Sequence, residues 1–282
     1  MPLALKRGVQ GASRLSVLSK ITKQLRWAPA RYWFYLREGM TSSVSVRDPA
    51  DGETYRFHAD SLHAFQRGKE FLTKEPKTIE WLRKNVRPAD VFLDIGANVG
   101  TFSIYAAKHM SAEGRVYACE PHLPTAVQLL QNVAANGVND RVSVVSVAAS
   151  NSDGFFPFKY KRWRQGASGS QLAVDGGIDL EKNVGTELNS AMRIDSMVEK
   201  GLIRCPNLIK IDTDGLEIPI VEGMSGLLKG ANRPRSALVE IQPGELDRQT
   251  ALMQSCGYRL AEKHQLTADG QGAFNAVFEP AP

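Results

Sequence analysis

The sequence Val-Phe-Leu-Asp-Ile-Gly-Ala-Asn-Val-Gly-Thr-Phe at residues 91–102 determines the predicted fold. Its first three residues are apolar, as in a strand buried on both faces of a parallel sheet. Asp94 ends this run, and Gly96 and Gly100 then flank a turn that opens a helix over residues 101–109. Such glycines let a ligand approach the backbone, and a helix N-terminus supplies free N–H groups. The stretch therefore predicts a strand–turn–helix site of the nucleotide-binding type.

Short apolar strands alternate with helical segments along the rest of the chain. This alternation predicts an α/β fold with a doubly wound, mostly parallel, Rossmann-like sheet, and an antiparallel strand pair closes it at the C-terminus. The expected parallel strands are 115–119, 141–149, 208–211 and 237–241, the helices are 124–136 and 246–255, and the closing pair is 258–263 with 273–278.

Three segments lie outside this alternation. Residues 43–47 and 54–58 alternate around a Pro-Ala-Asp-Gly turn and predict a β-hairpin, and a helix follows that begins at Glu75-Pro76. Residues 155–160 predict an extra hairpin-like strand. Residues 161–189 are rich in Gly, Ser and Asn, and we expect a mobile loop there.

Basic residues are concentrated at the N-terminus. Eight Lys and Arg residues precede the first acid, Glu38, so the other 27 basic residues face 30 acidic ones and the remainder carries −3. We therefore expect a basic helical or flexible arm over residues 1–40. A domain over residues 41–282 follows, with a lead-in over 41–74 and a core over 75–282.

The basic arm has three interpretations. Residues 1–38 could form a solvated helix that packs loosely on the domain, attach weakly to an anionic membrane surface or an acidic partner, or act as an organellar transit peptide. The three cysteines are far apart, which suits a reducing compartment, and no apolar run approaches the roughly 20 residues that span a bilayer. We expect a cytoplasmic protein with no DNA partner, and its oligomeric state is not predicted.

A second acid extends the predicted site. Glu120 ends the strand at 115–119, twenty residues beyond Gly100, where doubly wound folds place an acid on ribose hydroxyls. We therefore expect a ligand that contains adenosine, either NAD or S-adenosyl-L-methionine. Asp94 would repel a pyrophosphate but attract an ammonium group, and Asn98 stands where the dinucleotide pattern needs a glycine. Both features favour S-adenosylmethionine.

Four sequence motifs resemble those of the FkbM-type methyltransferases. They are Asp-Ile-Gly-Ala-Asn-Val-Gly at 94–100, Glu120-Pro121, Ala149-Ser150, and Ile-Lys-Ile-Asp-Thr-Asp-Gly-Leu-Glu at 209–217. The resemblance covers the chain from about residue 75 to the C-terminus. It implies a class I methyltransferase sheet, S-adenosylmethionine as cofactor, and methyl transfer to hydroxyl oxygens of natural products and sugars.

The resemblance also implies cofactor-binding residues by position. It assigns three groups of residues to three parts of S-adenosylmethionine: the methionine part, the ribose and the adenine. In that order, the groups are Asp94, Gly96, Ala97, Asn98 and Gly100; Glu120 and Pro121; and Ala149 and Ser150.

The reaction end of the site is predicted from strand ends. Asp212 follows the strand at 208–211, so it should face the same crevice as Asp94 and Glu120. A hydroxyl acceptor must lose a proton, and we expect Asp212 to be its general base, with Glu240 as a further candidate.

Asp214 and Glu217 are further catalytic candidates close to Asp212. Equally, they could cap the helix that starts there. The family commonly has Val-Glu-Gly-Ala-Glu after the aspartate, and the shorter Asp214 in this chain weakens its case. These acids could also hold a divalent metal, but nothing else in the sequence supports one.

The loop Lys161-Arg-Trp-Arg164, with residues 166–171, is the expected acceptor-facing lid. Trp163 could stack on a sugar or ring and Arg164 could bind an acidic group, although a solvated basic turn explains the same residues.

The sequence therefore predicts an S-adenosylmethionine-dependent O-methyltransferase that acts on a hydroxyl of a sugar or small natural product. An RNA or protein methyltransferase that uses the basic arm is one alternative. An NAD-dependent oxidoreductase and a degenerate methyltransferase scaffold are the others.

Overall fold

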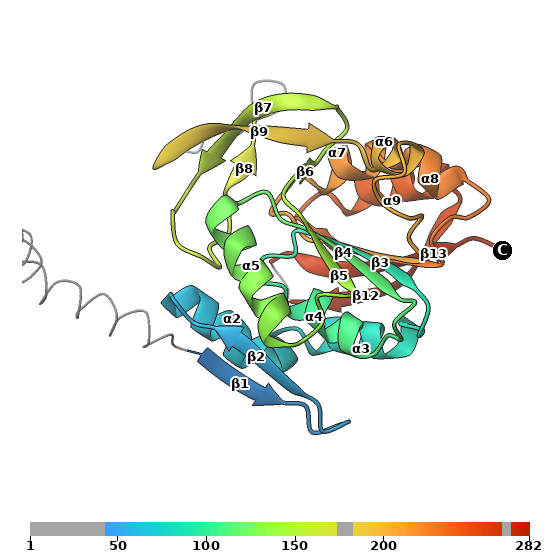
Figure 1. The fold of residues 1–282 in the computed structure, drawn as a ribbon. Coiled ribbons are helices and arrows are strands. Elements are labelled where there is room, and N and C mark those ends of the chain that lie inside the picture. The colour runs from blue at the N-terminus through green and yellow to red at the C-terminus, as the bar shows by residue number, and fades with distance from the viewer. Residues whose placement is uncertain (1–42, 174–182, 267–271) are drawn as a thin grey trace, which may run out of the picture. The chain divides into compact units, whose positions relative to one another are not determined.

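β3 (Val91–Ile95) lies inside a seven-stranded sheet of order β12-β13-β11-β10-β3-β4-β5, and all five of its residues are buried (Figure 1). The computed structural model describes residues 43–173, 183–266 and 272–282, and the expected arm at residues 1–40 lies outside them. The parallel strands are β3, β4 (Arg115–Cys119), β5 (Val142–Val145), β10 (Leu208–Ile211) and β11 (Ser236–Ile241). β12 (Tyr258–Gln265) and β13 (Phe274–Pro280) are antiparallel, so the predicted sheet and its closing pair are confirmed.

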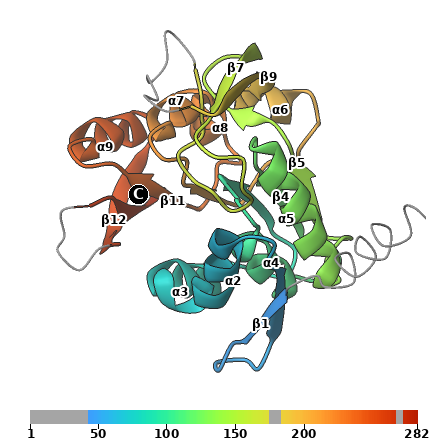
Figure 2. The ribbon, with the colours of Figure 1, turned by 90° about the vertical axis from the view of Figure 1, so that its left-hand side faces the viewer.

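Helices cover both faces of this sheet, as the alternating strands predicted. Successive side chains of a strand point to opposite faces, so Phe92 packs in one apolar cluster and Leu93 in another. Figures 1 and 2 show α3 and α4 on one side and α6 to α9 on the other. The helices are α3 (Pro76–Asn85), α4 (Thr101–Lys108), α5 (Leu123–Ala135), α6 (Ile194–Glu199), α7 (Glu217–Glu222), α8 (Ser225–Lys229) and α9 (Leu246–Ser255).

A second, four-stranded sheet of order β6-β9-β7-β8 corrects two predictions. The strand expected over 141–149 is divided: β5 ends at Val145, and β6 pairs instead with β9. The loop expected over 161–189 contains strand residues at both ends, although residues 174–182 lie outside the described residues. Burial of Phe158, Tyr160 and Leu172 against Ala148 accounts for this sheet. Its strands are β6 (Ala148–Ala149), β7 (Gly154–Tyr160), β8 (Gln171–Leu172) and β9 (Gly185–Met192).

The predicted hairpin is confirmed as β1 (Ser43–Arg47) and β2 (Thr54–His58), but the helix that follows it was not predicted. This helix, α2 (Leu62–Lys74), begins where the Ser61 hydroxyl accepts the Ala64 N–H at 3.0 Å. Its buried residues, Ala64, Gly68 and Phe71, recur at helical spacing and pack toward the hairpin. α2 therefore fixes the hairpin to the domain.

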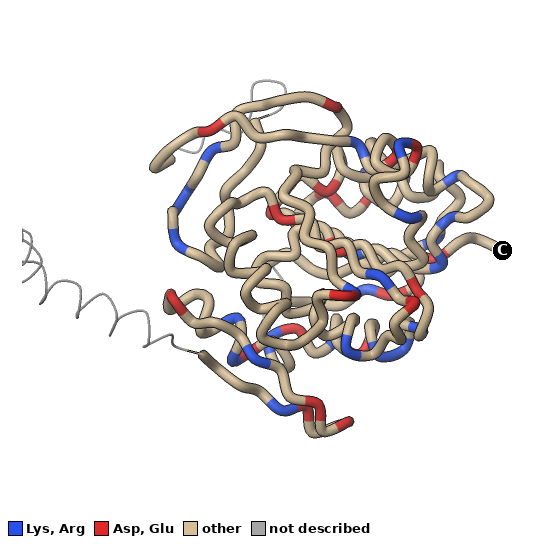
Figure 3. The backbone as a smooth tube through the Cα atoms, viewed as in Figure 1, with Lys and Arg blue, Asp and Glu red and all other residues tan. Residues whose placement is uncertain are grey.

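Lys, Arg, Asp and Glu are interspersed over the elements of the domain (Figure 3). At the end of β7 and in the loop that follows, four basic residues lie close together in the sequence: Lys159, Lys161, Arg162 and Arg164. Across the described ranges, the structure has no helix with the length and apolar character that a membrane span requires.

Candidate active site

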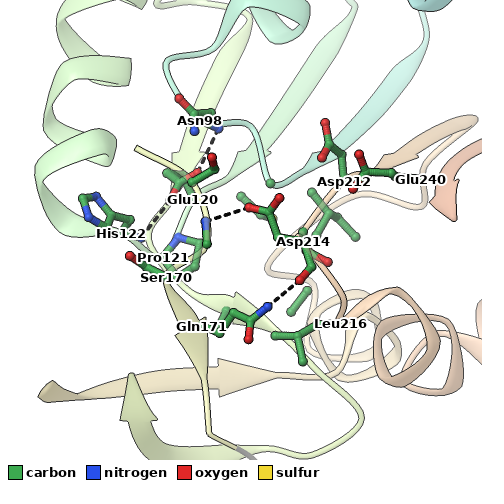
Figure 4. Close-up of a pocket in the computed structure, with 18 of the residues that line it drawn as sticks. Asn98, Glu120, Pro121, His122, Ser170, Gln171, Asp212, Asp214, Leu216 and Glu240 are labelled. Atoms are coloured by element: carbon green, nitrogen blue, oxygen red, sulfur yellow. Dashed lines mark hydrogen bonds between the residues drawn. The ribbon is translucent and has the colours of Figure 1, made fainter. Parts of the chain in front are cut away.

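A cavity of about 340 Å³ lies beyond the carboxyl ends of β3, β4 and β10. This is the edge of an open α/β sheet at which ligands bind. Figure 4 shows Asn98 and Glu120 on one side of the cavity, and Asp212 with Glu240 on the other. Eight of the residues predicted for the site line it: Gly96, Asn98, Glu120, Pro121, Ala149, Asp212, Asp214 and Glu240.

The turn after β3 depends on a glycine. Gly96 has φ +77°, and a Cβ there would lie 1.8 Å from the carbonyl oxygen of Asp212. A larger residue would therefore separate the ends of β3 and β10. Asn98 also has a left-handed backbone, φ +50°, which asparagine tolerates better than most residues. The sequence thus brings the ends of these two strands together at the cavity.

Glu120 closes the other side of this turn. Its two oxygens accept the backbone N–H groups of Asn98 and His122, each at 2.8 Å. Burial raises the pKa of Glu120 to about 7, against the effect of these donors. The carboxylate is therefore held rigidly at the end of β4, where it can accept hydrogen bonds from a ligand in the cavity.

Asp94 does not line the cavity. It is fully buried, and its Oδ2 accepts the Ser103 hydroxyl at 2.6 Å. Lys210 lies opposite Asp94 on the neighbouring strand β10. The Lys210 ammonium is 4.0 Å from Asp94 Oδ1, and it donates a hydrogen bond to Asp212 Oδ2 at 2.8 Å. Burial raises the pKa of Asp94, although Lys210 opposes it. In the structure Asp94 therefore faces a buried lysine, whereas the sequence had placed it on the methionine part.

Asp212 and Glu240 carry opposite pKa shifts on the same side of the cavity. Burial alone would raise the pKa of Asp212, but the Lys210 ammonium outweighs it and the pKa lies below its ordinary value. Burial and the charges of Asp212, Glu217 and Asp214 raise the pKa of Glu240 to about 8. One acid is therefore ionised at neutral pH, and the other binds and releases a proton close to it, the arrangement of an acid–base pair.

Asp214 and Glu217 bind backbone groups nearby. Glu217 is buried outside the cavity, and its Oε1 accepts N–H groups of Thr213 and Gly215 at 2.9 and 3.2 Å. These groups lie in the turn before α7, whose first residues have no side-chain cap, so Glu217 holds the turn and does not cap the helix. Asp214 lines the cavity with φ +57°, and its Oδ2 accepts the Gly169 N–H at 2.8 Å. Asp214 therefore anchors the segment that covers the cavity.

That segment, residues 165–171, is called the strap below. It crosses from α2 to the turn after β10, and Figure 4 shows the side chain of Gln171 reaching Asp214. Polar bonds join it to α2 with its cap and to the turns after β3 and β10, so it is a structured wall rather than a free loop. They are Ser61 Oγ to Gln165 O (2.7 Å), Arg67 Nε to Gly166 O (2.8 Å), Asn98 Nδ2 to Ala167 O (3.3 Å) and Gly169 N–H to Asp214 Oδ2 (2.8 Å).

Five other predicted residues lie outside the cavity. Trp163 is 55% exposed and lies tilted against Tyr160, with ring centroids 4.5 Å apart. Arg164, on the same loop, is exposed. The remaining three are buried in the domain: Ala97 in the core, Gly100 against Leu129, and Ser150 where its N–H donates to Met192 O.

The site also contains residues that the sequence had not indicated. Arg67, Lys74 and Glu75 reach the cavity from α2 and its end. The helical spacing of apolar residues behind Ser61 is the signal that could have found them. His122 differs from these three, because its position next to Glu120-Pro121 in the sequence already placed it near the predicted site. It lines the cavity, and its Nε2 binds Arg162 O at 2.9 Å. Burial lowers the pKa of His122, so its ring is neutral at pH 7.

Comparisons with known proteins place the chain among methyltransferases. The family model for the methyltransferase FkbM domain matches residues 94–260. The chain is 27% identical over 220 residues to hexuronic acid methyltransferase AglP of Haloferax volcanii, covering 77% of this chain and 82% of that protein. It is 28% identical over 224 residues to 31-O-demethyl-FK506 methyltransferase FkbM of Streptomyces tacrolimicus, covering 71% and 85%. A solved methyltransferase FkbM from Methylobacillus flagellatus KT is 17% identical, with a TM-score of 0.46 over 78% of this chain and 55% of that one.

Proposed function

The chain belongs to the FkbM methyltransferase family, and from this premise we propose that it transfers a methyl group from S-adenosylmethionine to a hydroxyl of a sugar or small natural product. One observation carries the proposal. A single cavity has a rigid acid for ribose, Glu120, at one end and the acid pair Asp212 and Glu240 at the other. Methyl transfer needs the cofactor and the acceptor in line, and one cavity with two chemically different ends suits that need.

The lining residues fit the parts of the cofactor. Apolar side chains between β6, β8 and α7 suit the adenine ring; they are Val147, Ala148, Ala149, Phe158, Leu172, Leu216 and Ile220. Glu120 suits the ribose hydroxyls. When bound, the cofactor supplies a methyl group on a positively charged sulfur. The negative charges of the acids on the cavity wall would stabilise this positive charge.

We propose that Glu240 removes the acceptor proton. A general base works best when its pKa lies near the operating pH, and the pKa of Glu240 is about 8. With S-adenosylmethionine bound, its methyl group would pass from the sulfur to the acceptor oxygen, and Glu240 would take the hydroxyl proton. Asp212, ionised beside Lys210, orients the hydroxyl and keeps the Glu240 proton affinity high. This exchanges the order of the two bases that the sequence suggested.

The acceptor class rests on two relatives. One is named for hexuronic acid and the other for the 31-O position of demethyl-FK506. Both names support an oxygen acceptor on a small molecule. Trp163 and Arg164 lie outside the cavity on an exposed loop, so their proposed role is to contact acceptor groups that extend beyond it.

Calorimetry tests the cofactor, and a screen tests the acceptor. We expect S-adenosylhomocysteine to bind and NAD not to bind. Binding of NAD alone would contradict the proposal. Candidate sugars and natural products with free hydroxyls are then incubated with S-adenosylmethionine, and release of S-adenosylhomocysteine identifies the acceptor.

A further inference from the structure

One wall of the cavity carries charges of both signs. Among the described residues that line the cavity, the only cations are Arg67 and Lys74, both from α2, and Glu75 follows them directly. The methionine part of S-adenosylmethionine ends in an ammonium and a carboxylate on the same carbon. Resting on the proposed function, we infer that this wall binds that zwitterion, with Glu75 facing the ammonium and Arg67 and Lys74 facing the carboxylate.

The ammonium needs an acid other than Asp94. Asp94 is fully buried and shares its surroundings with Ser103 and Lys210, so a ligand in the cavity has no access to it. Glu75 is half-buried and lines the cavity. Its Oε2 accepts the Thr78 hydroxyl at 3.1 Å, and within the described part of the chain its Oε1 has no hydrogen-bond partner. Glu75 therefore has a fixed orientation and a free oxygen.

Arg67 is held in the same way. Its Nε donates to Gly166 O of the strap at 2.8 Å, and its terminal nitrogens have no bond among the residues that the structure describes. Arginine presents paired N–H groups that match a carboxylate. Burial raises the pKa of Glu120 and the Arg67 charge opposes this rise, while at Asp212 the Arg67 charge adds to the stronger effect of Lys210 that lowers the pKa. The Arg67 charge therefore acts on both ends of the cavity. Lys74 also acts on Asp212 and lies at the last turn of α2.

The mixed signs favour the cofactor over an acidic acceptor. An acceptor with a carboxylate alone would gain from Arg67 and Lys74 but would be repelled by Glu75. A zwitterion gains from all three residues.

The test compares two ligands of the full-length chain by calorimetry. S-adenosylhomocysteine contains the amino-acid group, whereas 5′-methylthioadenosine keeps the adenosine and sulfur but lacks it. In Glu75→Gln and in Arg67→Met, we expect S-adenosylhomocysteine affinity to fall about tenfold or more, as for a lost charged hydrogen bond. The affinity for 5′-methylthioadenosine should stay within about twofold of wild type, because this ligand lacks the ammonium and the carboxylate that Glu75 and Arg67 would bind.

Two exposed residues of α2 outside the cavity lining supply the controls. Glu70→Gln and Lys69→Met make the same changes of charge on the same helix, and both ligands should bind these variants as they bind wild type. An equal loss for both ligands, or no loss for either, in Glu75→Gln and Arg67→Met overturns the inference alone. A wild-type protein that binds neither ligand overturns the proposed function as well.

Discussion

Glu240 links the chemistry of the site to pH. Its pKa of about 8 means that a base at this position is mostly protonated at neutral pH. We therefore expect kcat to rise with pH through the neutral range, with an apparent pKa at or below 8 because a bound cationic cofactor favours the ionised form. Glu240→Gln should reduce kcat by about 10²- to 10⁴-fold and leave S-adenosylhomocysteine affinity within about twofold.

The pH profile of kcat and a binding titration check this together. Glu199→Gln, an exposed acid far from the cavity, is the matched control and should keep the wild-type profile. If Glu240→Gln turns over normally, another group accepts the proton. Asp212→Asn then identifies it: lost turnover with unchanged cofactor affinity assigns the proton to Asp212, and normal turnover assigns it to solvent.

Glu240 should also lower the stability of the folded state at basic pH. The folded state binds a proton at Glu240 up to about pH 8, whereas the unfolded state releases it near the ordinary value of 4.5. The folded state therefore loses stability as pH rises between these values. Glu240→Gln should raise the urea midpoint at pH 8 and change it little at pH 4.5. A variant with the same midpoint shift at both values would show that packing, not charge, is responsible.

Lys210 is the residue on which the buried charges depend. It is fully buried between Asp94 and Asp212, and burial alone would lower its pKa, but those acids raise it instead. Lys210→Met leaves Asp94 buried without its cation, and breaking such a pair costs about 3–5 kcal/mol. Urea unfolding measures this loss. The double variant Lys210→Met with Asp94→Asn should recover part of it, and no recovery would mean that Lys210 acts through packing alone.

At the scale of elements, α2 has the strongest influence on the site, since it provides one cavity wall and two contacts to the strap. Ser61 both caps α2 and donates to Gln165 O at 2.7 Å. Ser61→Ala should therefore lower the free energy of unfolding by about 1 kcal/mol. The variant should also weaken cofactor binding, because the strap loses its hydrogen bond from Ser61 to Gln165 O. Thr73→Ala, which removes an exposed hydroxyl at the other end of α2, controls for helix propensity and should leave binding unchanged.

The elements that the sequence predicted are those with a local signal. β3, β4 and β10 are short, mostly apolar runs with an acidic residue at or just after the end of each. Apolar runs and turn residues were therefore enough to predict these strands and the sheet edge at which they end. The second sheet did not, because β6 and β8 are only two residues long and depend on partners far along the chain. The burial of Asp94 against Lys210 could not be predicted for the same reason, because Lys210 lies more than one hundred residues later in the chain.

At the scale of the whole molecule, the cavity and the basic N-terminus belong to different parts of the chain. Contacts divide the chain into residues 1–42 and residues 43–282, and all cavity-lining residues fall between Arg67 and Ala273. A chain that begins at Ser43 should therefore bind S-adenosylhomocysteine with wild-type affinity and methylate a small hydroxyl acceptor at the wild-type rate. Turnover of that acceptor should also change little with salt, because the acceptor needs no cationic arm.

The alternative of an RNA or protein acceptor makes the opposite prediction. Eight basic residues in the N-terminal part would hold a polyanion, and binding that neutralises several phosphates falls by on the order of 10³-fold or more between about 50 and 200 mM salt. Activity on total RNA that disappears both on deleting residues 1–42 and on adding salt would establish this alternative. Small-acceptor turnover that survives both treatments would leave the arm without a role in catalysis, and loss of S-adenosylhomocysteine binding on truncation would instead place the arm within the site.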